Sequence, residues 1–100
     1  MTSDVMKYLP GIKKLLQQHF VEQAYLFGSS VKGNMHVHSD VDILVRFTPE
    51  LDYETYANNY FNLLHALQNL LNKSVDLVAE ETLSNPYLIQ DINLNKFAIL

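Results

Sequence analysis

The segment Ser39-Asp-Val-Asp-Ile-Leu-Val-Arg-Phe47 places two aspartates at the start of an apolar run that is rich in β-branched residues. This composition predicts a β-strand over residues 41–47. Because alternate residues of a strand point to the same face, Asp40 and Asp42 would present two carboxylates together, about 7 Å apart along the chain. Val41, Ile43 and Val45 would then face the core.

Paired carboxylates repel each other unless a cation neutralises them. Mg²⁺ prefers oxygen ligands, keeps some of its waters and commonly binds substrate phosphates at the same site. Asp40 and Asp42 therefore indicate a magnesium site. The alternative interpretation of the same spacing is an aspartate-rich strand end that only faces solvent.

A third aspartate interrupts the apolar segment Ser74-Val-Asp-Leu-Val78, which predicts another strand. Carboxylates are rarely placed in such strands without a partner. If this strand lies beside residues 41–47, Asp76 joins Asp40 and Asp42 on one face of a sheet, where two metal ions about 3.5–4 Å apart could bind. An edge-strand aspartate that faces water is the alternative.

A glycine- and serine-rich turn, Gly28-Ser-Ser-Val-Lys-Gly33, directly follows an apolar run over 24–27 that predicts a buried strand. If a helical turn starts at Ser29, its free N–H groups and the serine hydroxyls would form a cradle for phosphate. A plain tight turn after a strand is the alternative, because such turns are common.

Helical periodicity predicts one helix after Pro10 and a long one from about residue 52 to 72. The tail from residue 82 reads as one or two short helices broken at Asn85-Pro86. The order of helices and strands predicts an α/β fold with a small mixed sheet packed by helices. The apolar end, residues 97–100, is either packed on the domain or held for a partner.

The chain has 100 residues, 48% apolar and 18% charged, which predicts one globular domain over 1–100 and excludes a disordered chain. No cysteine is present, so thiolate metal sites and disulfides are excluded. Residues 1–4 lack the features of a signal peptide, and no apolar run is long enough to span a membrane. The absence of cysteine fits a reducing cytoplasm, which is the expected location.

Seven basic residues against eleven acidic ones give a net charge of −4. Binding to a phosphate backbone needs several lysine or arginine contacts, so direct polynucleotide binding is disfavoured. The acidity suits divalent cations instead.

The motif Gly28-Ser29, then Gly33, then Ser39-Asp-Val-Asp-Ile-Leu-Val45, with a later Val-Asp-Leu-Val strand, resembles the polymerase β-type nucleotidyltransferase superfamily. Within it, the chain is most similar to the minimal nucleotidyltransferases, the MNT antitoxins of HEPN/MNT toxin–antitoxin pairs. The resemblance covers nearly the whole chain. Such proteins usually have Ala-Arg before the second glycine, where this chain has Val31-Lys32, and lysine keeps the charge but loses bidentate phosphate geometry.

The resemblance implies a role for each matching residue. Asp40 and Asp42 would hold two Mg²⁺ ions that bridge the phosphates of ATP, and Asp76 would complete the site and help to activate the acceptor hydroxyl. The reaction would be an in-line attack on the α-phosphate, with pyrophosphate leaving. The positions that would bind the nucleotide are Gly28, Ser29, Lys32, Gly33 and Ser39.

A chain of this length has no room for an acceptor domain, so another molecule must supply the acceptor. The resemblance implies a HEPN ribonuclease toxin as partner, encoded next door, bound as a hetero-oligomer and adenylylated on a tyrosine. Two alternatives stay open. The chain could block the toxin by binding alone, or it could transfer AMP to a small molecule such as an aminoglycoside.

The remaining candidates are weaker. His36 and His38 stand two residues apart and could bind zinc or copper, although histidines in a polar loop are more often solvated. His65 on the polar flank of the long helix is interpreted as structural. The tyrosine stripe of Tyr53, Tyr56 and Tyr60 predicts core or subunit interface rather than a substrate platform.

Overall fold

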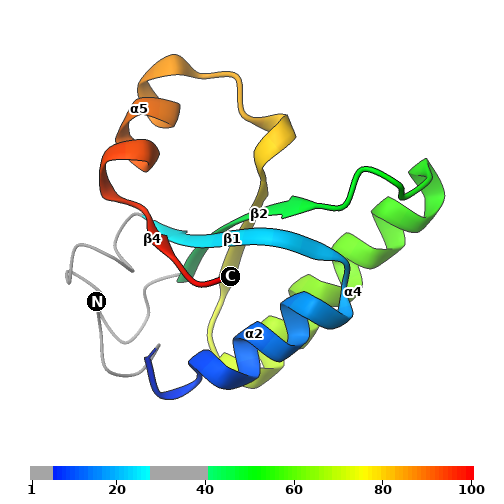
Figure 1. The fold of residues 1–100 in the computed structure, drawn as a ribbon. Coiled ribbons are helices and arrows are strands. Elements are labelled where there is room, and N and C mark those ends of the chain that lie inside the picture. The colour runs from blue at the N-terminus through cyan, green and yellow to red at the C-terminus, as the bar shows by residue number, and fades with distance from the viewer. Residues whose placement is uncertain (1–5, 28–40) are drawn as a thin grey trace.

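One mixed β-sheet with helices on both sides organises the chain in the computed structural model, which describes residues 6–27 and 41–100 (Figure 1). The sheet has four strands in the order β3-β2-β1-β4. The elements, in chain order, are α2 (Leu9–Gln18), β1 (Val21–Phe27), β2 (Val41–Phe47), α4 (Tyr53–Leu71), β3 (Val75–Ala79), the short 3₁₀ helix η1 (Glu80–Thr82), α5 (Pro86–Asn95) and β4 (Phe97–Ala98).

The strand directions follow from the connections. β1 pairs antiparallel with both β2 and β4, whereas β2 pairs parallel with β3. A parallel pair needs a crossover long enough to return the chain to the same end of the sheet, usually a helix. The crossover here is α4, with 19 residues. The predicted α/β class and mixed sheet are confirmed.

The main core lies between the sheet and the helix pair α2 and α4, which cover one side of it (Figure 1). Val41, Ile43 and Val45 of β2 are completely buried on this side, as their alternation predicted. The helices contribute fully buried residues at helical spacing, namely Ile12 and Leu16 from α2 and Leu63 and Leu67 from α4. The even-numbered residues of β2 therefore belong to the other face.

That other face is covered in part by α5, which lies across from α2 and α4 (Figure 1). A small second cluster holds it there, made of Phe27 from β1, Leu44 from β2 and Ile92 from α5. The break predicted at Asn85-Pro86 is where α5 begins. The Asn85 side chain accepts hydrogen bonds from the backbone N–H groups of Tyr87 (2.9 Å) and Leu88 (3.3 Å), so it caps the helix.

The C-terminal residues pack on the domain, which decides between the two possibilities left by the sequence. β4 pairs with β1, with Tyr25 opposite Ala98 and Leu26 opposite Phe97. Ile99 is only 2% exposed, and its backbone N–H donates to the carbonyl of Ala24 at 2.9 Å. The apolar end is thus a fourth strand that completes the sheet.

Two tyrosines of α4 fasten the helix to the β3 side of the sheet. The Tyr60 hydroxyl donates to the backbone carbonyl of Leu77, and the Tyr56 hydroxyl donates to Glu81 at 2.6 Å. Burial, followed by the hydrogen bond and negative charge of Glu81, raises the pKa of Tyr56 above its usual range. Both tyrosines pack against the core, as predicted, whereas Tyr53 is 90% exposed.

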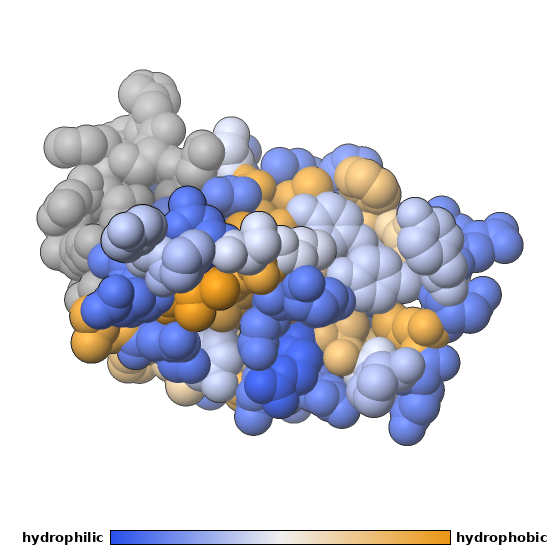
Figure 2. Space-filling model, turned by 90° about the horizontal axis from the view of Figure 1, so that it is seen from above, coloured by the Kyte–Doolittle hydropathy of each residue, from blue (hydrophilic) through white to orange (hydrophobic). Residues whose placement is uncertain are grey.

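No helix in residues 6–27 and 41–100 combines the length and apolarity needed to cross a membrane. Seen from above, the hydrophobic groups on the surface lie between hydrophilic ones and do not form one continuous patch (Figure 2).

Replacing Leu63 by alanine should lower the free energy of unfolding by about 2–5 kcal/mol, because the side chain is fully buried between α4 and the sheet. Urea unfolding followed by circular dichroism measures this. The matched control is Leu94→Ala on α5, where the side chain is 76% exposed and the change should stay within about 0.5 kcal/mol. Equal losses in the two variants would contradict the assigned core.

The raised pKa of Tyr56 predicts a loss of stability at alkaline pH. Its neutral phenol is favoured in the folded chain, so the contribution is complete below the ordinary tyrosine pKa of about 10 and declines as pH rises above it. Tyr56→Phe should therefore unfold more easily by about 1 kcal/mol at pH 8, and this difference should shrink above pH 10. Tyr53→Phe, at an exposed position, should follow the wild type at every pH, and a constant gap for Tyr56→Phe would disprove the assignment.

Candidate active site

Asp42 and Asp76 lie side by side on neighbouring strands. They are Cα partners in the parallel pair of β2 and β3, so their side chains leave the same face of the sheet. Adjacent strands are separated by about 4.8 Å, which brings two carboxylates into one row. The face is the one opposite α2 and α4, because the flanking residues Val41, Ile43, Val75 and Leu77 are buried in the main core. The sequence analysis expected Asp76 to join Asp42 if their strands were neighbours, and the structure has these strands side by side.

The row places two side chains of the same negative charge, Asp42 and Asp76, on adjacent strands. Like charges directly opposite each other on adjacent strands destabilise a sheet. Asp42 is half-buried and Asp76 is exposed at the edge strand. Asp76 also acts on Tyr60, whose pKa is raised by burial first and by this negative charge second.

The donor chemistry of the row fits a divalent cation. Carboxylate oxygens are hard ligands that suit Mg²⁺, which is commonly bound through one or two carboxylates and completes its shell with water and phosphate. Within the described ranges, no group of three histidine, aspartate or glutamate side chains is placed to hold a metal. The third predicted ligand, Asp40, lies outside those ranges.

Most of the predicted nucleotide-binding residues also lie outside the described residues: Gly28, Ser29, Lys32, Gly33 and Ser39, together with His36 and His38. The strand that leads to the glycine-rich turn is described, however. β1 ends at Phe27, which is the Cα partner of Asp42 across the antiparallel pair. β1 therefore ends directly beside the carboxylate row.

The same face continues into a groove between the sheet and α5, which we call the α5 groove. It has a volume of about 250 Å³. The lining includes Tyr25, Leu44, Arg46, Ile92, Asn93 and Lys96. The Lys96 ammonium lies 4.3 Å from the centre of the Tyr25 ring. Sequence reasoning missed this groove, because only the docking of α5 brings residues 92–96 over β1 and β2.

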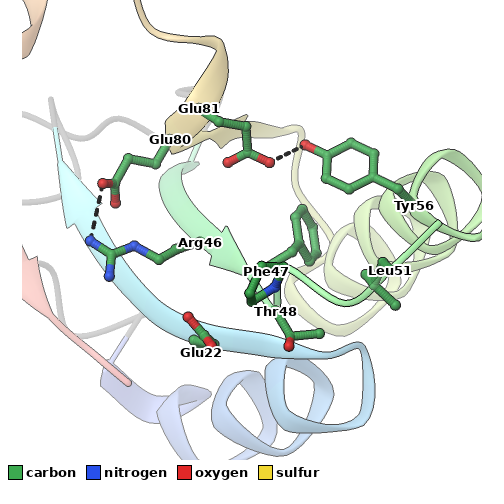
Figure 3. Close-up of a pocket in the computed structure, with 9 residues that line it drawn as sticks. Glu22, Arg46, Phe47, Thr48, Leu51, Tyr56, Glu80 and Glu81 are labelled. Atoms are coloured by element: carbon green, nitrogen blue, oxygen red, sulfur yellow. Dashed lines mark hydrogen bonds and ion pairs between the residues drawn. The ribbon is translucent and has the colours of Figure 1, made fainter. Parts of the chain in front are cut away.

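A larger cavity of about 500 Å³ lies at the opposite end of β2, where β2 meets η1 and the start of α4 (Figure 3). Two interactions lie within it: Arg46 forms a 3.2 Å ion pair with Glu80, which raises the pKa of Arg46, and Tyr56 donates to Glu81. Phe47 in its wall is five residues from Asp42, or about 17 Å along a strand. This cavity is therefore separate from the carboxylate row, and its ion pair and hydrogen bond join β2 and α4 to η1.

Comparisons with known proteins agree with this geometry. The family described as polymerase beta, nucleotidyltransferase, matches residues 11–99. MJ1379 of Methanocaldococcus jannaschii, named for an inferred protein adenylyltransferase activity, is 34% identical over 95 residues, which cover 87% of this chain and 93% of the relative.

Solved structures show the same fold with a partner and a nucleotide analogue. A crystal structure of a toxin–antitoxin with AMP-PNP superposes with a TM-score of 0.74 at 29% identity, over 92% of this chain and 72% of that one. A second structure contains a tri-AMPylated HEPN toxin of Shewanella oneidensis in complex with its MNT antitoxin. It has a TM-score of 0.66 at 25% identity, over 95% of this chain and 71% of that one. With the family match spanning nearly all of its length, the chain belongs to the polymerase β-type nucleotidyltransferase family.

Proposed function

We infer that this chain is a magnesium-dependent protein adenylyltransferase that acts as an antitoxin, transferring AMP from ATP to a tyrosine of a HEPN toxin partner in the cytoplasm. The observation that carries the inference is the row of Asp42 and Asp76, in register on neighbouring parallel strands. Two carboxylates in this arrangement offer the oxygen ligands that Mg²⁺ prefers, on one face of the sheet.

The relatives and neighbours support the choice of reaction and partner. The curated relative is named for protein adenylyltransferase activity, and this chain spans nearly all of its length. One structural neighbour holds an ATP analogue in a toxin–antitoxin complex, and another is bound to an AMPylated HEPN toxin. These properties belong to those proteins, and the shared fold and family make them the best hypothesis for this one.

Each residue has a stated role in the proposal. Asp40, Asp42 and Asp76 would hold Mg²⁺, which when bound offsets the negative charge of the phosphates. The residues proposed to bind the triphosphate are Gly28, Ser29, Lys32, Gly33 and Ser39. The tyrosine oxygen of the acceptor forms a bond to the α-phosphorus of ATP, the bond from that phosphorus to the β-phosphate oxygen breaks, and pyrophosphate leaves. Asp76, exposed at the sheet edge, would accept the hydroxyl proton.

Two other functions compete with this one. A purely binding antitoxin would use the fold and would not need Asp42 and Asp76 to share one face of the sheet. A transferase for a small-molecule acceptor would need a binding site for that molecule beside Asp42 and Asp76. A variant of Asp42 or Asp76 that still neutralises the toxin would support the binding antitoxin. Aminoglycoside resistance in cells that express the chain would support the small-molecule transferase.

Replacing Asp42 or Asp76 by asparagine should reduce AMP transfer by about a hundredfold or more, because charge stabilisation supplies most of the rate in such a site. The measurement is the intact mass of the HEPN protein encoded beside this chain after incubation with ATP and Mg²⁺. The wild type should raise that mass by whole AMP units. Glu54→Gln, which removes an exposed carboxylate on α4, is the matched control and should behave like the wild type.

A HEPN protein that binds this chain and gains no mass would show a binding antitoxin instead. A variant at Asp42 or Asp76 that transfers AMP at the wild-type rate would remove these residues from the mechanism.

The carboxylate row also predicts an effect on stability that needs no partner. Asp76→Asn changes a side chain that is exposed at the sheet edge, so the free energy of unfolding in metal-free buffer should change by no more than about 0.5 kcal/mol. It should also reduce the rise in thermal midpoint that Mg²⁺ and ATP together produce. Thermal unfolding with and without both additives measures this, and a destabilised variant that keeps the full rise would contradict the metal site.

A further inference from the structure

Another groove runs along the free edge of the sheet, between β3 and the first half of α4, and we call it the β3-edge groove. Its volume is about 360 Å³. The lining is mostly aromatic and apolar, and it includes Tyr53, Tyr56, Tyr60 and Phe61 from α4 and Leu77 and Val78 from β3. Tyr53 is 90% exposed and Phe61 is 56% exposed, so two of these rings lie open to solvent. Exposed apolar surface that gathers in a groove is typical of a site where another molecule binds.

The groove begins beside the carboxylate row. Leu77 in its lining directly follows Asp76 on β3, a rise of about 3.3 Å along the strand. The negative charge of Asp76 also reaches Tyr60, where it adds to the effect of burial and raises the pKa of Tyr60. β3 is an outer strand of the sheet, so only its own width separates the groove from the face that carries Asp76. A protein that brings an acceptor hydroxyl to Asp76 can therefore also cover the groove.

The free edge of β3 is closed to a partner strand. The Ser74 carbonyl accepts from the first N–H of β2 at 2.9 Å, so it points toward β2. Because successive carbonyls of a strand point in opposite directions within the sheet, those of Leu77 and Ala79 point toward the free edge. The first accepts from the Tyr60 hydroxyl, and the second accepts from the Thr82 hydroxyl at 2.7 Å. A partner strand would have to displace both hydroxyls, so the edge favours binding through side chains, as in a helix that lies in a groove.

The charge around the groove defines the partner further. The described lining contains no lysine or arginine. Exposed carboxylates flank the lining residues of β3 along the chain, with Asp76 before them and Glu81 after them. Glu81 accepts from the neutral Tyr56 hydroxyl at 2.6 Å, which leaves its negative charge in place (Figure 3). An apolar stripe flanked by basic side chains would complement this arrangement.

We propose that the β3-edge groove binds an amphipathic helix of the acceptor protein and so holds the acceptor tyrosine near Asp76. The inference rests on the proposed function, because it takes the HEPN toxin as the acceptor. Apolar side chains of that helix would pack on the exposed rings of Tyr53 and Phe61, and basic side chains would lie near Glu81. Aromatic residues bury a large area at low entropic cost and often dominate the binding energy of an interface.

The groove would act on binding and not on the chemical step. None of its lining residues is a proposed ligand of Mg²⁺ or ATP. A change at the exposed rings should therefore raise the KM for the acceptor protein and leave kcat nearly unchanged.

The principal test is Phe61→Glu, which places a charge on the exposed apolar part of the groove. Its affinity for the HEPN protein encoded beside this chain should fall by about tenfold or more, measured by isothermal titration calorimetry without ATP or Mg²⁺. In the transfer assay, the KM for the HEPN protein should rise by a similar factor, while kcat stays within about twofold of the wild-type value. The matched control is Phe20→Glu, between α2 and β1, where the side chain is 52% exposed, and it should change neither quantity.

Hydrogen exchange of the wild-type chain keeps the test valid if Phe61→Glu misfolds. Exchange followed by mass spectrometry compares the free chain with its complex with the HEPN protein. Peptides from residues 53–61 and 77–82 should exchange more slowly in the complex, and peptides from α2 should not change. The affinity of the wild type should also fall at high salt, because salt screens complementary charges.

The outcomes separate a failure of this inference from a failure of the proposed function. AMP transfer by the wild type, with unchanged affinity and KM in Phe61→Glu or unchanged exchange in residues 53–61 and 77–82, overturns only the inference. A complex that Phe61→Glu weakens, without AMP transfer by the wild type, supports the groove as the docking surface and overturns the proposed reaction. An affinity that does not depend on salt overturns the basic character assigned to the helix. Dimers of the free chain that Phe61→Glu dissociates, at unchanged affinity for the HEPN protein, would assign the groove to a second copy instead.

Discussion

The parallel pairing of β2 with β3 is the constraint on which the candidate site depends. It places Asp42 opposite Asp76, and a shift of one residue would turn Asp76 into the core and bring an apolar side chain to the open face. Two features oppose such a shift. The crossover helix α4 packs its buried leucines on the sheet, and Tyr60 of α4 donates to the backbone carbonyl of Leu77, the residue after Asp76. The packing of α4 on the core face therefore fixes the register of Asp42 and Asp76 on the opposite face.

The two faces of the sheet are specialised in opposite ways. The face under α2 and α4 is apolar along its whole length, so it supplies the stability of a small domain. The other face has only a small cluster of Phe27, Leu44 and Ile92 beneath α5. On one side of that cluster lies the pair of Asp42 and Asp76, and on the other lies the α5 groove with Arg46, Glu80 and Lys96 in its lining. Because the face under α2 and α4 supplies the stability of the domain, the other face can hold charged side chains.

Local pattern was enough to predict the elements that are most regular. The strand over 41–47 has the predicted bounds because its odd-numbered residues alternate cleanly, and α4 differs from its prediction by one residue at each end. β3 is displaced by one residue, from 74–78 to Val75–Ala79. β4 was not predicted, because a strand of two residues has no periodicity of its own and exists only through its pairing with β1. The α5 groove escaped prediction for the same reason, since it depends on where α5 docks and not on any single segment.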